Sequence, residues 1–420
     1  MSLKVTFSDI QKAAQVIENV THRTPLEASH TASSMLGASC YFKLENLQKT
    51  GSFKIRGAYN KIHSLSAEHK KKGVIASSAG NHAQGVARSA QLQGVRATIV
   101  MPKGASLVKA QATQSYGAQV IFHGDSVDEA ILYAKDLAKD QGLTFLHPYA
   151  DPWVIAGQGT IGLECYNQLP EVDTIIVPIG GGGLISGIAT AIKHLKPHCR
   201  ILGVVSDCTP GMKLLKEKIT QTHQTEQDQK TQPTHHANFC VTIADGIAVK
   251  KPSQEIFEHF IDPYVDHIAS VSDEEIAEAI VFAMERMKIV IEGSGAAPLA
   301  AALHGKLKLG NHNIFILSGG NIDLNLMAKI IQKFQLRHGR IAEVGISVSD
   351  LPGSLNSITH LIAQSGANIL DVRHDRLSSD LGLRETRIFI TMETKDALHT
   401  KEIVEDLRRK GFSVVKDKNH

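Results

Sequence analysis

A lysine suited to covalent chemistry lies in residues 50–57 (TGSFKIRG), where small residues flank Lys54 at the start of an amphipathic segment. A lysine amine can form a Schiff base with an aldehyde when its stem is held and its proton is loosely bound, because free lysine is charged at neutral pH. Most lysines in any chain are solvated charges, so this run by itself indicates little. Three further segments strengthen the interpretation.

Residues 77–85 (SSAGNHAQG) form a small-residue loop between a strand-like run at 73–76 and a helix-like run at 86–93. A loop in this position turns backbone amides outward, and the helix dipole makes the place favourable for a carboxylate. A serine or asparagine cap on an ordinary helix would give the same pattern. From the loop alone both interpretations stand.

Four consecutive glycines, at 180–183, follow an apolar run at 174–179 and precede a helix-like run at 184–192. Glycines leave the backbone bare, so several amides at a helix start can converge on a phosphate group. The run lacks the Lys-Ser/Thr of a Walker loop and the spaced glycines of a dinucleotide fingerprint. Since a tight turn needs only one or two glycines, this loop predicts phosphate binding.

A further strand-like run, at 313–317, ends in Ser318-Gly319-Gly320-Asn321. The hydroxyl group of Ser318 can hydrogen-bond a ring nitrogen, whereas a carboxylate in its place would hold that nitrogen protonated. A lone Ser-Gly-Gly sequence fits any loop, and only the other segments give it meaning.

Together the four segments resemble the fold type II pyridoxal-phosphate enzymes, and the threonine dehydratase (threonine ammonia-lyase) family in particular. That family has the patterns Ser-Phe-Lys-x-Arg-Gly, Ser-Ala-Gly-Asn-His-Ala-Gln-Gly, Gly-Gly-Gly-Gly-Leu and Ser-Gly-Gly-Asn. They occur here in the same order. The match extends from about residue 5 to residue 325 and includes the early run 23–26 (RTPL).

The resemblance implies a role for each matching residue. Lys54 would form a Schiff base with pyridoxal 5'-phosphate, Asn81 would hydrogen-bond the ring oxygen, and Ser318 would face the ring nitrogen. The residues implied in cofactor binding are Phe53, Lys54, Asn81, Gly180, Gly181, Gly182, Gly183, Leu184 and Ser318, with the glycine amides on the phosphate. The residues implied in substrate binding are Ser78, Ala79, Gly80, Asn81 and His82.

The implied reaction is a β-elimination that converts L-threonine to 2-oxobutanoate and ammonia, and L-serine to pyruvate. A neutral Ser318 weakens the electron sink of the cofactor, which favours expulsion of the β-hydroxyl over transamination. The similar serine racemases have a second serine where this chain has Ala79, and alanine cannot carry a proton. The alternatives are serine dehydratase, serine racemase and catabolic threonine dehydratase, and the non-enzyme alternative is an amino-acid-binding sensor.

Relatives often have a glutamate of a cation site near position 206, where this chain has Ser206. Hard cations prefer several oxygen ligands, carboxylates among them. Asp207 or Asp245 would have to compensate, and no metal site is predicted. Glu292 lies near the site expected from the relatives, where a structural role is favoured over substrate binding.

Short apolar strands alternate with helical runs from about residue 39 to residue 318. This alternation predicts βαβ units and parallel sheets with helices on both faces. The resemblance implies an α/β fold like that of tryptophan synthase β, with two parallel-sheet domains. The catalytic region would span residues 1–325, with a smaller subdomain at about 54–150 inserted in the larger one.

A helix at 326–340 is predicted to link this region to residues 341–420, whose pattern reads βαββαβ. That order is typical of a small α+β, ferredoxin-like domain. Residues 350–355 (DLPGSL) match the Asp-x-Pro-Gly-x-Leu loop of ACT domains, which this part resembles. The resemblance implies an allosteric homodimer or homotetramer in isoleucine biosynthesis, with isoleucine or valine as effector. A module that only assembles subunits is the alternative.

The composition excludes some partners. With 45 basic and 42 acidic residues and no basic block, the chain is not predicted to bind nucleic acid. Residues 175–192 are uncharged but contain a proline and glycines at a strand-to-helix turn, so no membrane span is predicted. The lack of an apolar N-terminal leader, together with five irregularly spaced cysteines, predicts free thiols and a cytoplasmic location.

Overall fold

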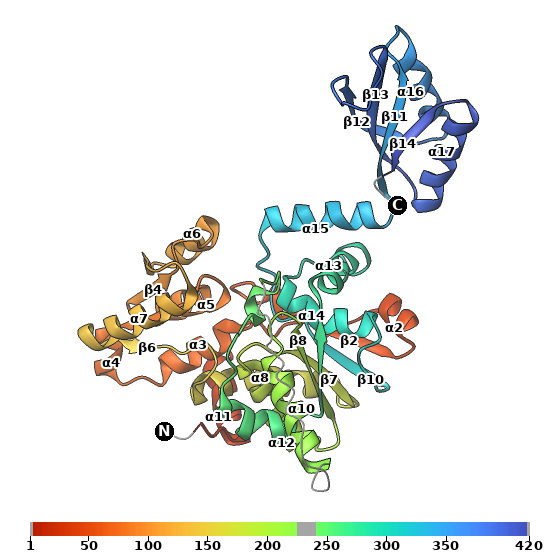
Figure 1. Cartoon of the computed structure of the whole chain (residues 1–420). Coiled ribbons are helices and arrows are strands. Elements are labelled where there is room, and N and C mark those ends of the chain that lie inside the picture. The colour runs from red at the N-terminus through yellow and green to blue at the C-terminus, as the bar shows by residue number, and fades with distance from the viewer. Residues whose placement is uncertain (1–2, 225–240, 418–420) are drawn as a thin grey trace. The chain divides into compact units, whose positions relative to one another are not determined.

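The structure, a computed structural model, describes residues 3–224 and 241–417 (Figure 1). It divides into two compact units, residues 1–322 and residues 323–420. Helix α15 (Leu324–Arg337), which was predicted as a linker, counts with the second unit. The first unit contains all four segments that the sequence singles out.

The larger sheet of the first unit has six strands in the order β1-β2-β10-β7-β8-β9. Neighbouring strands are parallel, except that β1 and β2 pair antiparallel. The apolar runs become strands here because helices cover the sheet on both faces. The strands are β1 (Leu26–Ala28), β2 (Ser39–Lys43), β7 (Thr174–Pro178), β8 (Arg200–Ser206), β9 (His267–Val271) and β10 (His312–Ile316).

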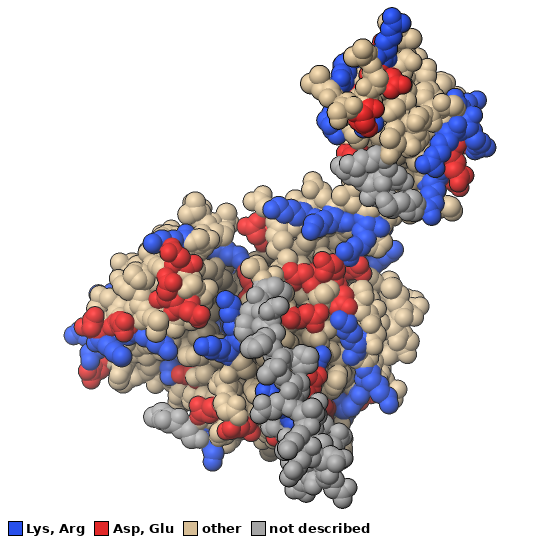
Figure 2. All heavy atoms as spheres, in the orientation of Figure 1, with Lys and Arg blue, Asp and Glu red and all other residues tan. Residues whose placement is uncertain are grey.

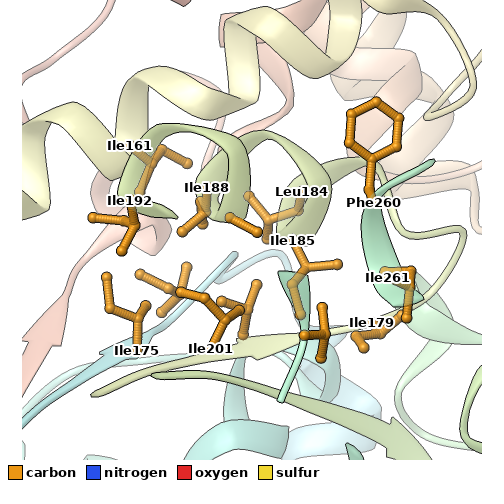
Figure 3. Close-up of a cluster of buried hydrophobic side chains, with 14 of the residues drawn as sticks. Ile161, Ile175, Ile179, Leu184, Ile185, Ile188, Ile192, Ile201, Phe260 and Ile261 are labelled. Carbon is orange, nitrogen blue, oxygen red and sulfur yellow. The ribbon is translucent and has the colours of Figure 1, made fainter. Parts of the chain in front are cut away.

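Helix α9 (Gly183–Leu195) supplies much of the core of this larger part (Figure 3). Its side chains face strands β7 and β8, and each large apolar side chain buried there stabilises the fold by about 1.5–3 kcal/mol. Gly187 lets α8 (Pro152–Gln168) approach closely, since a Cβ atom would lie 2.4 Å from the carbonyl oxygen of Ile155. This packing fixes the start of α9, where the glycine loop lies. The facing core residues include Leu184, Ile185, Ile188 and Ile192 from α9 and Ile175 and Ile201 from the strands.

The smaller sheet has four parallel strands in the order β5-β4-β3-β6. Alternate residues of a strand point to opposite faces. Val74 and Ala76 therefore share a core with helices α3 (Lys54–His63) and α5 (Asn81–Leu92), whereas Ile75 packs against α7 (Val127–Gln141). The strands are β3 (Val74–Ser77), β4 (Ala97–Met101), β5 (Gln119–Phe122) and β6 (Thr144–Phe145).

The remaining helices of the first unit surround the two sheets. The α-helices are α1 (Phe7–Ile17), α2 (His30–Leu36), α4 (Ala67–Lys72), α6 (Leu107–Ser115), α10 (Gly211–Gln224), α11 (Gln254–Ile256), α12 (Asp262–Tyr264), α13 (Asp273–Phe282) and α14 (Gly293–Leu303). Short 3-10 turns form η1 (Glu45–Leu47) and η2 (Asp245–Ile247), and π-helical turns form η3 (Phe257–Ile261) and η4 (Ala283–Met287).

The second unit contains a four-stranded antiparallel sheet in the order β12-β13-β11-β14. After α15, its elements follow the predicted βαββαβ order. Helix α17 begins at Ala397, where the side chain of Asp396 accepts a hydrogen bond from the amide of His399 and caps the first turn. The elements are β11 (Ile341–Ser349), α16 (Ser354–Gln364), β12 (Asn368–Asp375), β13 (Glu385–Glu393), α17 (Ala397–Arg409) and β14 (Ser413–Asp417).

The surface and the cysteines can be compared with the sequence predictions. Both acidic and basic side chains lie on the face drawn in Figure 2. No helix in the described part of the chain is both long and apolar enough to cross a membrane. Cys40, Cys165 and Cys199 are free and buried, but Cys208 is disulfide-bonded, so the prediction of free thiols is wrong for that residue. Sequence spacing does not show which residues the fold brings close together.

Candidate active site

Lys54 is the first residue of helix α3, and its amine is held in place. The Nζ atom donates a hydrogen bond to the carbonyl oxygen of Pro148 over 3.0 Å and lies 5.0 Å from the centre of the Phe53 ring. Burial lowers the pKa of Lys54 to about 8, although the charge of Glu292 acts in the opposite direction. More of the amine is therefore neutral near pH 7 than in a free lysine.

The Ser-Gly-Gly segment lies directly against the segment that contains Lys54. The amide of Phe53 donates to the carbonyl oxygen of Ser318 over 3.2 Å. Ser52 and Gly319 form an antiparallel bridge next to it. Two motifs from opposite ends of the catalytic region are thus hydrogen-bonded through their backbones, and the buried Ser318 is positioned beside Lys54.

Helix α5 begins at Asn81, earlier than the predicted start at residue 86. The prediction placed the start after Gly85, because glycine is unfavourable inside a helix. Glycine eases the packing at this position, since a Cβ atom would lie 3.1 Å from the backbone carbon of Lys54, closer than an ordinary contact. The substrate loop therefore ends at Gly80, and no side chain caps the first amides of α5. The amide of Gly80 donates to the Oγ atom of Ser78 over 3.2 Å.

Asn81 connects this loop with Glu292 and with the Ser318 segment. Its Nδ2 atom donates to Oε1 of Glu292 over 2.6 Å, and its Oδ1 atom accepts from Nδ2 of Asn321 over 2.7 Å. The same Glu292 oxygen accepts from Oγ of Ser294 over 2.7 Å. Burial, with a contribution from the charge of Asp245, raises the pKa of Glu292. Asn81 is thus held on two sides, by the side chains of Glu292 and Asn321.

Each glycine of the loop 180–183 is packed so closely that no side chain fits. Gly182 has a φ angle of +90° and caps α9 without a side-chain hydrogen bond. The first amides of α9 are left for a ligand. The nearest atoms to a Cβ would belong to Ile247 for Gly180 (2.9 Å), to Tyr149 for Gly181 (2.3 Å) and Gly183 (2.8 Å), and to Ile256 for Gly182 (2.6 Å). Tyr149 follows Pro148, so this loop lies near the Lys54 amine.

A buried ionic cluster anchors the segment behind Lys54. Arg56 binds both oxygens of Glu45, over 2.8 and 2.9 Å, and both oxygens of Glu164, over 2.6 and 3.0 Å. Lys43 also donates to Glu164, over 2.6 Å, and Thr24 donates to Glu45 over 2.6 Å. Arg56, Glu45 and Lys43 are fully buried. The early Arg-Thr-Pro-Leu run and the Lys-x-Arg pair therefore meet in one cluster.

The ring of His82 is hydrogen-bonded to the backbone and is poorly suited to proton transfer. Its Nε2 atom is 3.1 Å from the carbonyl oxygen of Leu146. Burial lowers the pKa of His82 to about 3, with a further lowering from the Lys54 charge. A neutral ring that donates to Leu146 joins the start of α5 to the residue that follows strand β6. Any contact with substrate would come from the backbone of His82.

Two of the polar residues considered for a cation, Ser206 and Asp245, contact other side chains. Ser206 donates to Oγ1 of Thr242 over 3.2 Å, and Asp245 forms an ion pair with Lys109 at 2.9 Å. In residues 3–224 and 241–417, no group of three or more His, Cys, Asp or Glu side chains could hold a metal ion.

Three contributors to the site were given no role from the sequence. Pro148 accepts the Lys54 hydrogen bond, Tyr149 packs on the glycine loop, and Asn321 bonds to Asn81. Only Asn321 had a signal, since it ends the Ser-Gly-Gly-Asn motif. Glu292, for which a structural role was favoured, lies inside the site and contacts Asn81 directly.

The fold and the site define a class of protein. A family model described as pyridoxal-phosphate dependent enzyme matches residues 17–319, which is most of the chain. The chain belongs to this family of pyridoxal-phosphate dependent enzymes.

Particular relatives narrow the class. An L-threonine ammonia-lyase of Thermotoga maritima is 44% identical over 410 residues, which cover 98% of this chain and 99% of that protein. Among solved structures, maize serine racemase has a TM-score of 0.70 and 35% identity, and covers 79% of this chain and 98% of its own. Threonine deaminase isoform 2 of Solanum lycopersicum has a TM-score of 0.68 and 34% identity, covering 78% of this chain and 90% of its own.

Proposed function

We propose that this enzyme is a threonine ammonia-lyase that converts L-threonine to 2-oxobutanoate and ammonia, and also L-serine to pyruvate. The observation that carries the proposal is the meeting of Lys54, Asn81, the glycine loop and Ser318 in one site. The similarity to the Thermotoga maritima L-threonine ammonia-lyase over nearly the whole chain supports this substrate.

The residues present suit pyridoxal 5'-phosphate. A buried amine with a lowered pKa suits covalent attachment of an aldehyde at Lys54. The bare amides of residues 180–183 and of Leu184, at the start of α9, suit a phosphate group. Asn81 has a donor for the ring oxygen, Ser318 has a neutral hydroxyl for the ring nitrogen, and the Phe53 ring contributes an apolar surface.

The chain's own residues bind the substrate and move its proton. When bound, the cofactor withdraws electrons from the α-carbon of the amino acid. Ser78, with the backbone amides of Ala79, Gly80 and the start of α5, receives the substrate carboxylate. The Nζ atom of Lys54 takes the α-proton as general base, for which its lowered pKa is suited. The β-hydroxyl takes up a proton and leaves as water, and water then hydrolyses the C=N bond of the released 2-iminobutanoate to give 2-oxobutanoate and ammonia.

Serine racemisation is the second candidate, because maize serine racemase is a structural neighbour. Racemisation needs a proton carrier on the face opposite Lys54. The serine racemases place a serine there, and this chain has Ala79. We therefore expect no D-serine to be formed.

For the second unit we propose an ACT domain that regulates the enzyme in cytoplasmic isoleucine biosynthesis as a homodimer or homotetramer. Its βαββαβ order and its 350–355 loop support the assignment. Gly353, at a φ angle of +94°, starts α16 without a side-chain cap, and Arg376 holds Asp350 over 2.9 Å. An amide-lined helix start of this kind suits the carboxylate of isoleucine or valine.

Two measurements test the catalytic proposal. Borohydride reduction followed by peptide mapping should place the cofactor on Lys54, and L-threonine should yield 2-oxobutanoate. Lys54→Ala should lose both the yellow colour and the activity, whereas Lys49→Ala, at an exposed position nearby, should keep both. A colourless wild-type protein supplied with cofactor, or an adduct on another lysine, would refute the proposal.

The regulatory proposal has its own test. The full chain and a chain ending at residue 322 are assayed with threonine while isoleucine and valine are titrated. We expect only the full chain to respond. Identical responses of the two chains would refute the regulatory role with these effectors. Subunit assembly would then be the remaining role for the second unit.

A further inference from the structure

The side-chain amide of Asn321 has both of its hydrogens committed. Its Nδ2 atom donates to the carbonyl oxygen of Thr50 over 2.9 Å and to Oδ1 of Asn81 over 2.7 Å. Its Oδ1 atom lies against Gly51, where a Cβ atom would be only 2.4 Å away. Gly51 and Gly320 are themselves joined by a backbone hydrogen bond of 2.9 Å. The amide is therefore held in a packed setting.

The chemistry of these partners permits one orientation of the amide. An asparagine side chain can rotate by half a turn and exchange its oxygen with its nitrogen, but a backbone carbonyl can only accept. If Asn321 turned over, its oxygen would face the oxygen of Thr50, and both would lack a proton. The carbonyl of Thr50 therefore fixes which side of Asn321 carries the donor.

The orientation passes from Asn321 to Asn81. Because Asn321 presents a donor, Asn81 must turn its Oδ1 atom toward it, and its Nδ2 atom then lies on the other side. There Nδ2 meets Glu292, whose Oε1 atom accepts from Asn81 over 2.6 Å and from Ser294 over 2.7 Å. Both neighbours thus select the same rotamer. One Nδ2 hydrogen is used by Glu292, and the second remains for another acceptor.

We propose that Asn321 is a positioning residue that turns the amide of Asn81 so that a donor, not an acceptor, faces the ring oxygen of the cofactor. The inference rests on the proposed function, in which Asn81 contacts that oxygen. A ring oxygen that carries negative charge is stabilised by an N–H donor and repelled by a carbonyl oxygen. Asn321 acts through Asn81 and has no proton to give in the reaction.

Asn321→Asp is the sharpest test, because it keeps the shape of the side chain and replaces the donor with an acceptor. The new carboxylate faces Oδ1 of Asn81, so Asn81 keeps its Nδ2 atom on Glu292 only by moving away from position 321, and otherwise turns its Oδ1 atom toward Glu292 and the ring oxygen. In either case the donor of Asn81 is no longer held toward the ring oxygen. We expect apoprotein of this variant to bind pyridoxal 5'-phosphate roughly 10- to 100-fold more weakly, the range for a lost hydrogen bond to a charged group. The visible absorbance band should also lose intensity to the near-ultraviolet band, because the ring oxygen keeps its proton.

A double-mutant cycle separates positioning from a structural effect. In an Asn81→Ala background, Asn321→Asp should cause no further change in cofactor affinity or in the ratio of the two bands. An equal change in both backgrounds, or wild-type affinity and spectrum in Asn321→Asp, would overturn the inference. If Asn321→Asp does not fold, Asn321→Ala takes its place in the same cycle, with a smaller expected loss because no acceptor is introduced.

The outcome is distinguishable from a failure of the proposed function. A wild-type protein that binds no pyridoxal 5'-phosphate would remove the proposed function and this inference together. A wild type that binds the cofactor on Lys54, with an unchanged Asn321→Asp, would remove the inference alone. Asn325→Asp, in the first turn of α15, is the matched control and should leave the affinity and the spectrum unchanged.

Discussion

Gly181 lies so close to Tyr149 that a Cβ atom on the glycine would be 2.3 Å from the Cγ and Cδ1 atoms of the ring. A real Cβ atom does not approach another atom so closely, so any side chain at position 181 must displace the tyrosine. The contact joins the glycine loop to the segment that holds the Lys54 amine through Pro148. The phosphate and aldehyde sites that we propose for the cofactor are therefore in direct packing contact through Tyr149 and Pro148.

Gly181→Ala should lower both stability and cofactor affinity. Overpacking of this kind costs about 1–3 kcal/mol, and the moved loop no longer presents its amides together. Urea unfolding of the apoprotein and titration with pyridoxal 5'-phosphate measure the two effects. Gly104→Ala is the control, because a Cβ atom there meets nothing within 4 Å. Equal behaviour of the two variants would contradict the role assigned to the loop.

The lowered pKa of Lys54 predicts the pH dependence of cofactor attachment. Only the neutral amine attacks an aldehyde, and with a pKa of about 8 its neutral fraction rises steeply from pH 7 and levels off above about pH 9. Stopped-flow absorbance of apoprotein mixed with pyridoxal 5'-phosphate gives the rate at each pH.

A lysine with its ordinary pKa near 10.4 would instead keep gaining about tenfold per pH unit through this range. Nα-acetyl-lysine amide has a free side-chain amine with an ordinary pKa. Its rate with the cofactor under the same conditions corrects for the titration of the cofactor itself. If the rate of the protein rises with pH as the rate of this model amine does, burial does not lower the pKa of Lys54.

The buried position of Arg56 predicts a large loss of stability in Arg56→Met. The substitution would leave the carboxylates of Glu45 and Glu164 without their main partner, and breaking a buried pair in this way costs about 3–5 kcal/mol. The cofactor should also bind more weakly, because α3 begins two residues earlier at Lys54. Urea unfolding of the apoprotein measures the first effect.

Lys72→Met provides the comparison, since Lys72 pairs with Glu68 on the surface with 46% and 74% of the side chains exposed. A pair of this kind contributes at most about 0.5 kcal/mol. Similar losses in the two variants would mean that the Arg56 cluster does not hold the site together.

The buried His82 and the partly buried His147 predict a loss of stability in mild acid. Burial lowers the pKa of His82 to about 3 and that of His147 to about 4, below the value near 6.5 of an unfolded chain. As the pH falls below about 6.5, only the unfolded chain takes up these protons, so the free energy of unfolding decreases by up to about 1.4 kcal/mol per pH unit for each histidine. The loss continues to about pH 4 for His147 and to about pH 3 for His82.

Urea midpoints measured between about pH 7.5 and pH 5 follow this loss. His82→Gln keeps a donor for the carbonyl oxygen of Leu146 but cannot take up a proton, so its stability should depend less on pH than that of the wild type. Parallel curves for the two proteins would show that His82 is not the residue responsible.

The sequence alone indicated the chemistry that we propose for the site and predicted the order of its elements. Lys54, the glycine loop and Ser318 could be found because each requires a particular residue type next to a strand or helix end. The alternation of strands and helices predicted parallel sheets, and the βαββαβ pattern after residue 340 appears as the antiparallel sheet of the second unit. Such features are local, since they depend on residues that follow one another in the chain.

The tertiary structure decided which groups meet and how they are oriented. The start of α5 was misplaced because Gly85 opposes a helix by its own propensity, and only its contact with Lys54 explains the glycine. The lowered pKa of Lys54 depends on burial in the packed unit, and the rotamer of Asn81 depends on Glu292 and Asn321, which lie far away in sequence. Burial and hydrogen bonding between such residues arise only when the whole unit packs, so no local pattern contains them.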